Sequence, residues 1–369
     1  MKKQRIVLAS VLKPVDDSRM FEKIGMSLAG NPNYEITIIG YPSRHPPASL
    51  EINFLPHPAF DRLSLKRALI SFTIGKKIYK AKPDALIVNT HELLIVAVAF
   101  RILFGTRIIY DIQENYWRNI LWTDTFPALF KHLLAALVRS KEIIFSRFFH
   151  LFFLAEKGFE KEMKFFRKNY VILENKCLLP SGITRTKSPD TIKLLFSGTI
   201  SESTGVFQAI QLATTLHHHD QSVRLHIIGY CSLPATLKAV RMAIREKPFI
   251  SLTGGDQLVP HSDIIAQLYT SDFGILYYPP SPHTENKIPT KLYEYLAAQL
   301  PLLLQNHKPW IDVCEPYKAA ISIDFKASID MASLVEKMKH TTFFPVAPTD
   351  VSWSSEEKKL LSFMEKVLV

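Results

Sequence analysis

The stretch 192–205, I-K-L-L-F-S-G-T-I-S-E-S-T-G, passes from a short apolar run through a glycine-containing turn to the start of a helix. Ile192–Phe196 has the length and continuous apolar character of a strand covered on both faces of a sheet, and Gly205–Leu216 has helical spacing. Gly198 lets the backbone at the turn approach a phosphate closely, and the helix that follows offers unpaired N–H groups. Strand, glycine turn and helix in this order predict one unit of a doubly wound α/β domain.

The same alternation of strand and helix extends along the chain in both directions. We predict further strands at 5–10, 35–40, 85–89, 107–111, 150–155, 224–229, 249–252, 273–276, 301–304 and 320–323. We predict helices over 18–28, 62–80, 92–104, 126–149, 237–245, 262–270, 291–298 and 354–368. Between the two halves, Glu174–Asp190 loses its periodicity and reads as a linker. The expected fold is therefore α/β, with two Rossmann-like domains at 1–178 and 179–350 and an interdomain cleft.

The spacing of the cysteines and the hydropathy of the chain limit the classes of protein to which it can belong. Cys177, Cys231 and Cys314 are far apart and show no C-x-x-C spacing, so neither a disulfide framework nor a zinc site is expected. His217–His219 are neighbours that point in different directions on a helix, and they make a poor metal site. No apolar stretch reaches the ~18 residues of a spanning helix, and no secretory signal fits. We expect a cytoplasmic protein without a bound metal.

The positive charge of the chain is concentrated in its first half. Residues 1–180 contain 27 Lys/Arg against 16 Asp/Glu, whereas residues 181–369 contain 18 of each. Such a basic half suggests an anionic partner, and nucleic acid, a lipid surface, a phosphate-bearing acceptor and plain solvation of helices all stay open. Leu129–His150 mixes Phe and Leu with Lys and Arg, which fits either contact with an anionic membrane or a buried helix with a solvated edge.

The strongest motif is Pro289–Tyr295, P-T-K-L-Y-E-Y, at the start of a predicted helix. Lys291 and Glu294 are three residues apart and therefore share a face. A lysine at a helix N-terminus suits a diphosphate, and a glutamate one turn later can accept hydrogen bonds from both hydroxyls of a ribose. The alternative from spacing alone is a surface ion pair.

This segment, with Leu296-Ala297-Ala298 and Pro301 after it, resembles the donor-site helix of GT-B glycosyltransferases. The resemblance is to the large retaining family (glycosyltransferase family 4-like) that includes sucrose and trehalose-type synthases and many bacterial polysaccharide enzymes. It implies that Glu294 holds the donor ribose and that Lys291 lies near the pyrophosphate as a catalytic group. Leu195–Gly205 resembles the glycine-bearing donor loop of that family, and Gly229 ends the next strand. The implied donor-binding residues are Gly198, Thr199, Thr204, Gly229, Lys287, Lys291 and Glu294.

Two segments of the first half resemble the acceptor side of the same family. Asp17–Phe21 resembles a loop in which Asp-x-Arg opens the first helix, and Tyr110–Asn115 resembles a Tyr-Asp-x-His-Glu segment. Both segments follow predicted strands, where open α/β sheets bind ligands, although Asp17 could instead simply cap the first helix. The resemblance also implies that the last helix, within 351–369, crosses back to the first domain. The implied acceptor-binding residues are Asp17, Arg19 and Glu114, and the implied catalytic residues of this half are Asp111 and Gln113.

The chain departs from this family at several positions. Thr199 and Thr204 stand where an Arg and a Lys are frequent, Asn286 stands where a Glu is frequent with Glu285 one residue out of register, and Gln113 stands where a His is usual. These departures keep two alternatives open: a non-catalytic GT-B-like protein that binds a nucleotide sugar or a partner glycosyltransferase, and a nucleotide-sugar epimerase.

The implied reaction transfers a sugar from a nucleoside-diphosphate sugar, as substrate and not cofactor, to a glycan, surface-polysaccharide or lipid-linked acceptor. No Asp-x-Asp occurs in the chain, so we expect a metal-independent reaction, and the family implies retention of the anomeric configuration. No nucleic acid partner is expected. Peripheral contact with an anionic membrane, at its inner face, is part of the hypothesis.

Overall fold

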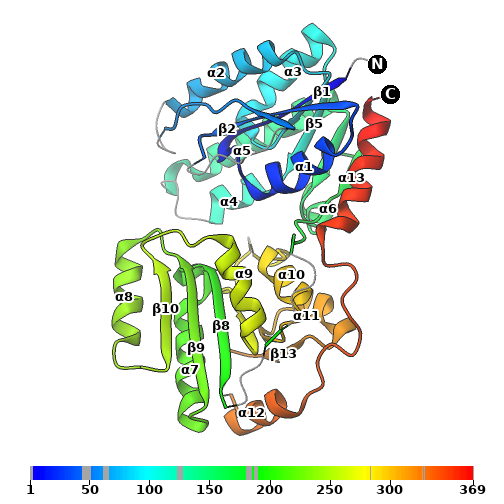
Figure 1. Ribbon diagram of the computed structural model, residues 1–369. Helices are drawn as coiled ribbons and strands as arrows, with labels where there is room; N and C mark the ends of the chain where they lie inside the picture. The colour runs from blue at the N-terminus through cyan, green and yellow to red at the C-terminus, as the bar shows by residue number, and fades with distance from the viewer. Residues whose placement is uncertain are drawn as a thin grey trace. The chain divides into compact units, whose positions relative to one another are not determined.

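The computed structural model describes residues 3–43, 51–60, 66–122, 128–179, 185–186, 190–282, 284–325, 327 and 329–368. Its contacts divide the chain into two compact units (Figure 1). The first unit comprises Met1–Asn175 together with Trp353–Val369, and the second comprises Lys176–Ser352. The division lies between Asn175 and Lys176, whereas the sequence led us to place it after residue 178.

The first unit is built on a seven-stranded sheet in the order β3-β2-β1-β4-β5-β6-β7, and every pair in it is parallel. The order reverses between β1 and β4, so the connections leaving these two strands diverge at the carboxyl edge. The strands are β1 (Gln4–Pro14), β2 (Tyr34–Tyr41), β3 (Ile52–Phe54), β4 (Ala85–Val88), β5 (Arg107–Ile112), β6 (Leu151–Leu154) and β7 (Tyr170–Ile172).

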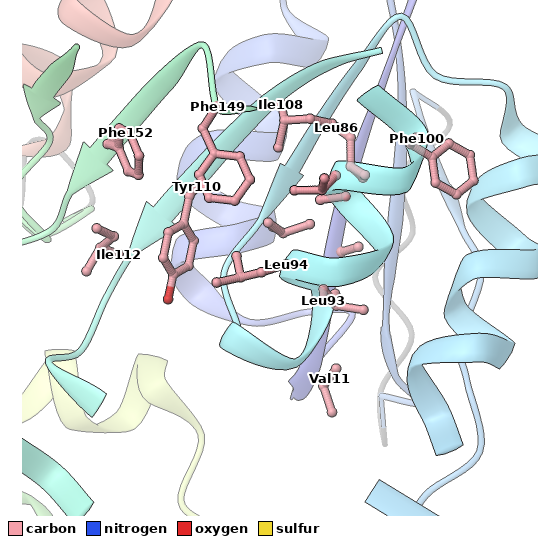
Figure 2. Close-up of a cluster of buried hydrophobic side chains, with 14 of the residues drawn as sticks. Val11, Leu86, Leu93, Leu94, Phe100, Ile108, Tyr110, Ile112, Phe149 and Phe152 are labelled. Carbon is pink, nitrogen blue, oxygen red and sulfur yellow. The ribbon is translucent and has the colours of Figure 1, made fainter. Parts of the chain in front are cut away.

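Helices cover this sheet on both faces because its strands are apolar on both faces. On one face, α2 and α3 pack on a core that includes Leu86, Ile108 and Tyr110 (Figure 2). On the other face, η1, α1 and α13 pack on Ile6 and Leu8. The helical elements are η1 (Ser18–Gly25, a π-helix), α1 (Met26–Ala29), α2 (Lys66–Ala81), η2 (His91–Leu93), α3 (Leu94–Phe104), α4 (Tyr116–Trp122), α5 (Ala128–Phe145), η3 (Ser146–Phe148), α6 (Phe159–Glu162) and α13 (Trp353–Leu368).

The second unit is built on a six-stranded parallel sheet in the order β10-β9-β8-β11-β12-β13, with its reversal between β8 and β11. Apolar cores lie on both faces of this sheet. Its strands are β8 (Ile192–Thr199), β9 (Val223–Tyr230), β10 (Ile250–Gly255), β11 (Phe273–Leu276), β12 (Leu302–Gln305) and β13 (Ala320–Ile323). Its helical elements are η4 (Glu202–Thr204), α7 (Val206–His219), α8 (Pro234–Ile244), α9 (His261–Thr270), α10 (Thr290–Ala297), α11 (Lys308–Cys314), η5 (Glu315–Tyr317) and α12 (Met331–His340).

The last helix, α13, returns to the first unit (Figure 1). The indole N–H of Trp353 donates to Ser27 Oγ at 2.9 Å, and this tryptophan is almost completely buried. Leu360 and Met364 are fully buried in the same apolar cluster as Ile6 and Leu8. The face of the first sheet that carries η1 is therefore closed by residues from the far end of the sequence.

The predicted two-sheet α/β architecture is confirmed. The elements that were missed include β3, β7, α4, α6, α11 and α12, and the helix predicted over 18–28 begins as a π-helix. Parts of the predicted helices at 62–65 and 126–127, and of the linker at 180–184 and 187–189, lie outside the described residues. No helix in the described ranges has both the length and the apolar character needed to cross a bilayer.

Candidate functional site

Three glycines lie side by side at the carboxyl edge of the second sheet. Gly198, Gly229 and Gly254 occupy the same register on β8, β9 and β10, with φ angles of 93°, 152° and 83°. A Cβ on Gly229 would lie 1.7 Å from the carbonyl oxygen of Gly198, so no side chain fits there. A Cβ on Gly198 would meet nothing within 4 Å. The edge therefore presents bare backbone beside open space at Gly198, which suits a bulky anionic group.

The loop after Gly198 is fixed by its own side chains. The Thr204 hydroxyl bonds to the carbonyl oxygen of Thr199 at 2.7 Å, and the backbone N–H of Ser201 donates to Thr204 Oγ1 at 3.2 Å. Gly205 has a φ of 80°, and a Cβ there would lie 2.3 Å from the ring of Tyr277. Thr204 therefore shapes the turn that precedes α7, while the side chain of Thr199 is exposed.

Lys291, in the first turn of α10, reaches back to this edge of the sheet. Its Nζ donates to the carbonyl oxygen of Ser197 at 3.2 Å and lies 5.0 Å and 5.2 Å from the ring centroids of Phe196 and Tyr278. Burial lowers the pKa of Lys291 to about 8, against the opposing effect of the Glu294 charge. An ammonium group has three donors, and one is used among the described residues. An anion at Gly198 would satisfy the remaining donors.

Glu294 lies one turn further along α10. Its side chain is 12% exposed, and Oε1 is 3.1 Å from Nε2 of His261 on α9. Within the described part of the chain, Glu294 and Lys291 make no ion pair with each other. Glu294 contacts His261 and Lys291 contacts Ser197, whereas spacing alone also allowed a surface ion pair between the two.

A cavity of about 390 Å³ adjoins Lys291 through Tyr278. It is lined by Tyr278, Pro280, Ser281, Pro282, Thr284, Glu285, His307 and Trp310. Glu285 lines this cavity, whereas Asn286 and Lys287 do not, although Lys287 O accepts from the indole N–H of Trp310 at 2.6 Å. The cavity lies next to the predicted donor residues and brings an acidic side chain close to them.

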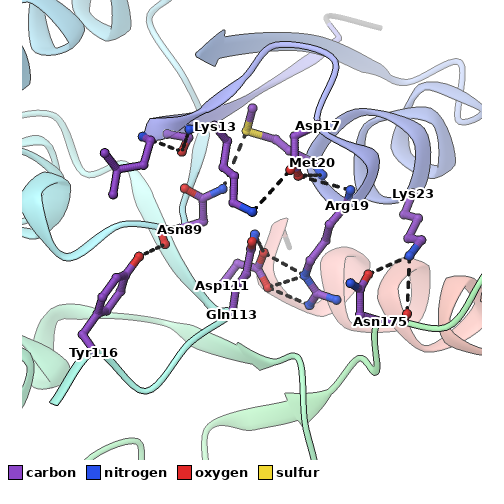
Figure 3. Close-up of polar contacts among 12 residues, drawn as sticks. Lys13, Asp17, Arg19, Met20, Lys23, Asn89, Asp111, Gln113, Tyr116 and Asn175 are labelled. Carbon is purple, nitrogen blue, oxygen red and sulfur yellow. Dashed lines mark hydrogen bonds and ion pairs between the residues drawn. The ribbon is translucent and has the colours of Figure 1, made fainter. Parts of the chain in front are cut away.

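In the first unit, the structure joins three predicted residues in one buried cluster (Figure 3). Arg19 Nη2 donates to Asp111 Oδ1 at 2.7 Å, Arg19 Nε donates to Oδ2 at 3.0 Å, and Nη1 donates to Leu173 O at 2.9 Å. Gln113 Nε2 donates to Asp111 Oδ2 at 2.7 Å. Arg19 and Asp111 are 3% and 2% exposed. The pair is thus enclosed in the protein, and Gln113 is its half-buried neighbour.

The other two residues predicted for this half lie apart from the buried pair. Asp17 caps η1 by accepting from the backbone N–H groups of Arg19 and Met20, and its carboxylate lies 3.4 Å from Lys13 Nζ. Glu114 is exposed and accepts from Asn119 Nδ2 at 2.8 Å. Asp17 and Glu114 are therefore the more accessible members of the predicted acceptor set.

A polar group that the sequence analysis missed lies at the end of β4. His91 Nδ1 is 2.9 Å from Lys141 Nζ, and Arg67 Nε donates to Glu92 Oε1 at 2.8 Å. Burial lowers the pKa of His91 to about 4, so its imidazole is neutral at pH 7. Asn89, 5% exposed, has an Oδ1 without a hydrogen-bond partner among the described residues. The sequence contained a pattern that could have predicted this group. N-T-H-E at 89–92 follows a buried strand, and Tyr110–Asn115 lies at the end of another.

No family model matches the chain, and no curated protein matches it. Among solved structures, it is similar to sucrose-phosphate synthase from Thermosynechococcus elongatus, with a TM-score of 0.71 and 10% identity over 99% of each chain. The fold is GT-B. The chain is also similar to HepE from Anabaena, solved with UDP and glucose (TM-score 0.62, 12% identity, 97% of this chain and 99% of that one). A third GT-B match is a protein assigned as a UDP-N-acetylglucosamine 2-epimerase from Listeria monocytogenes (TM-score 0.60, 11% identity, 98% and 96%).

We predict that Asp111→Asn destabilises the first unit of this GT-B chain. The substitution leaves the guanidinium of Arg19 buried without its counter-charge, which costs about 3–5 kcal/mol. Urea denaturation followed by circular dichroism measures the change, with Glu114→Gln as the exposed control. Unchanged stability would show that the pair is not what holds η1 to β5.

We also predict that Lys291 titrates near pH 8. Competitive acetylation followed by mass spectrometry should show its labelling rise through pH 8, well below the ordinary lysine value of about 10.4. Because the Glu294 charge raises the pKa of Lys291, Glu294→Gln should move this midpoint to lower pH. Labelling of Lys291 that rises only with the exposed lysines would contradict the buried environment.

Proposed function

We propose that this protein is a glycosyltransferase that moves a sugar from a nucleoside-diphosphate sugar to an acceptor. One observation carries the proposal: the Lys291 ammonium is held beside the open backbone of Gly198, one turn before Glu294. A diphosphate at Gly198 would meet the ammonium and the N-terminal end of α7 together. The ribose of the same nucleotide would then meet the Glu294 carboxylate, with Gly229 leaving room for it.

In the proposed reaction, the bond between the anomeric carbon and the diphosphate oxygen breaks, and an acceptor oxygen bonds to that carbon. The acceptor hydroxyl loses its proton, and the nucleoside diphosphate leaves with one additional negative charge. Lys291 and the backbone N–H groups would stabilise that charge as it develops, as preorganised donors do. Retention of configuration follows from the resemblance to the retaining family and is part of the proposal.

The acceptor is proposed to be a glycan or a lipid-linked sugar that meets the basic first unit at the cytoplasmic face of a membrane. The accessible residues there are Asp17, Gln113 and Glu114. His91 is not a further candidate for the base, since a pKa lowered to about 4 makes its imidazole a weak proton acceptor at pH 7.

A second candidate function is epimerisation of the nucleotide sugar. It is favoured by the fold shared with the protein assigned as a UDP-N-acetylglucosamine 2-epimerase. A non-catalytic binding protein is the third reading, motivated by Thr199, Thr204, Asn286 and Gln113. Epimerised donor in the absence of acceptor would favour the second, and donor binding without any turnover would favour the third.

The proposal predicts distinct effects for the two α10 residues. Glu294→Gln removes charge-assisted hydrogen bonds worth roughly 1.5–3 kcal/mol each, so donor affinity should fall by about one to two orders of magnitude. Lys291→Ala should lower kcat more than donor affinity, because the leaving-group charge grows in the transition state. Calorimetry across UDP-, GDP- and ADP-sugars, followed by steady-state kinetics, measures both.

The exposed Glu246→Gln is the matched control for these two variants, and melting temperatures exclude unfolding. Wild-type binding and turnover in both variants would remove the second unit as the donor site.

Turnover is also predicted to be independent of divalent metal, because lysine and backbone N–H groups are proposed to meet the diphosphate charge. Initial rates with EDTA should equal those with Mg²⁺ or Mn²⁺. Activity that is lost in chelator and restored by a divalent ion would refute this part of the mechanism.

A further inference from the structure

The outward face of α5 is apolar. Leu129, Leu133 and Leu137 recur every four residues on one side of the helix, and each is more than half exposed. Ala135 and Val138, on the opposite side, are buried against Ile120 of α4. A helix at the surface of a soluble protein normally turns its polar face outward. On α5 both sides are apolar. Packing in the core of this unit accounts for the inner side but not for the exposed leucines on the outer side.

The neighbouring helices extend the same surface. On α3, Ile95, Ile102 and Leu103 are each at least 60% exposed. α3 packs beside both α5 and α2 (Figure 1), and the rings of Tyr79 on α2 and Phe104 on α3 lie 5.7 Å apart. We call this surface the apolar face. Its exposed members are Leu69, Phe72, Tyr79, Ile95, Ile102, Leu103, Phe104, Leu129, Phe130, Leu133, Leu137, Ile143 and Ile144.

The charged residues on the helices of the apolar face and on α4 are almost all basic. The helices α2, α3, α4 and α5 contain a single acidic residue, Glu142, which is 1% exposed and paired with Arg139 at 3.2 Å. The basic residues whose side chains the structure describes on these helices are Arg67, Lys76, Lys77, Lys80, Arg101, Arg118, Lys131, Arg139 and Lys141. Two of them are paired with acidic residues outside these helices, Arg67 with Glu92 and Arg118 with Glu162. The exposed indoles of Trp117 and Trp122 lie on α4, which packs against α5. Apolar side chains with basic and aromatic neighbours are the composition of helices that lie in a bilayer interface.

We propose that the apolar face of α2, α3 and α5 docks on the surface of an anionic lipid bilayer. The charge of these helices favours a lipid bilayer over a protein partner. A surface of exposed apolar side chains and lysines, without exposed acidic side chains on α2, α3 or α5, complements a layer of negative headgroups. The helices would lie on the bilayer without crossing it. This inference deepens the proposed function and rests on it for the membrane-bound acceptor, but the surface it names is identified from the first unit alone.

The test uses the full chain with phosphatidylcholine vesicles that contain or lack phosphatidylglycerol. Of the four tryptophans, Trp310 and Trp353 are buried, so Trp117 and Trp122 report on this surface. Wild-type protein should sediment with the anionic vesicles and shift its tryptophan emission to shorter wavelength. Leu133→Glu with Leu137→Glu, and separately Ile102→Glu with Leu103→Glu, should each lower the partition coefficient at least about tenfold. Lys76→Glu with Lys80→Glu should weaken binding to anionic vesicles and make the remaining binding less sensitive to salt, because fewer attractive charges are left to be screened.

Met242→Glu with Leu258→Glu is the matched control, because these two large apolar side chains, 68% and 60% exposed, are about as exposed as the test residues but belong to the second unit. It should bind vesicles as the wild type does. Nucleotide binding, measured by calorimetry, should be the same in all variants, so that a failure here is distinguishable from a failure of the donor site. Absence of wild-type binding to anionic vesicles would overturn the proposal. So would sedimentation showing a dimer that the apolar-face substitutions dissociate, which would assign the face to a second copy of the chain.

Discussion

Both units are organised by one constraint: a parallel sheet with apolar strands must be covered on both faces. Once η1, α1 and α13 close one face of the first sheet, and α2 and α3 close the other, the polar groups that the sheet carries become accessible at its strand ends. Lys291 reaches the carbonyl of Ser197 at such an end, and Asp111 is the second-last residue of β5 at another. The positions of the candidate groups thus follow from burial of the sheets and not from the loops alone.

The sequence was sufficient for much of this arrangement. Continuous apolar strands separated by helical periodicity predicted both sheets, and the spacing of Lys291 and Glu294 placed them in the first turns of one helix. The spacing of residues along the sequence could not predict which distant side chains these residues contact. Glu294 meets His261, and Asp111 is enclosed by Arg19, because those contacts join residues 33 and 92 positions apart. Very short elements such as β7 escaped detection because three residues carry no periodicity.

The structure shows what side chains do at positions where the sequence differs from the family that it resembles. Thr204 does not supply the charge that a lysine would, yet its hydroxyl holds the turn that brings α7 to Gly198. Positive charge at this edge is left to Lys291, whose burial makes its proton easier to lose. A nucleotide diphosphate bound beside Lys291 would raise the pKa of this lysine again. Nucleotide binding and protonation of Lys291 would therefore be thermodynamically linked.

The return of α13 to the first unit has a consequence for synthesis on the ribosome. The N-terminal half emerges first, but the surface formed by Ile6, Leu8 and Ile24 lacks Trp353, Leu360 and Met364 until the second unit has been translated. The second unit can close its own cores before the first one is complete. During that interval η1 and α1 cover this sheet face without α13, so the nascent first unit exposes part of its apolar core, which is the kind of surface that chaperones bind.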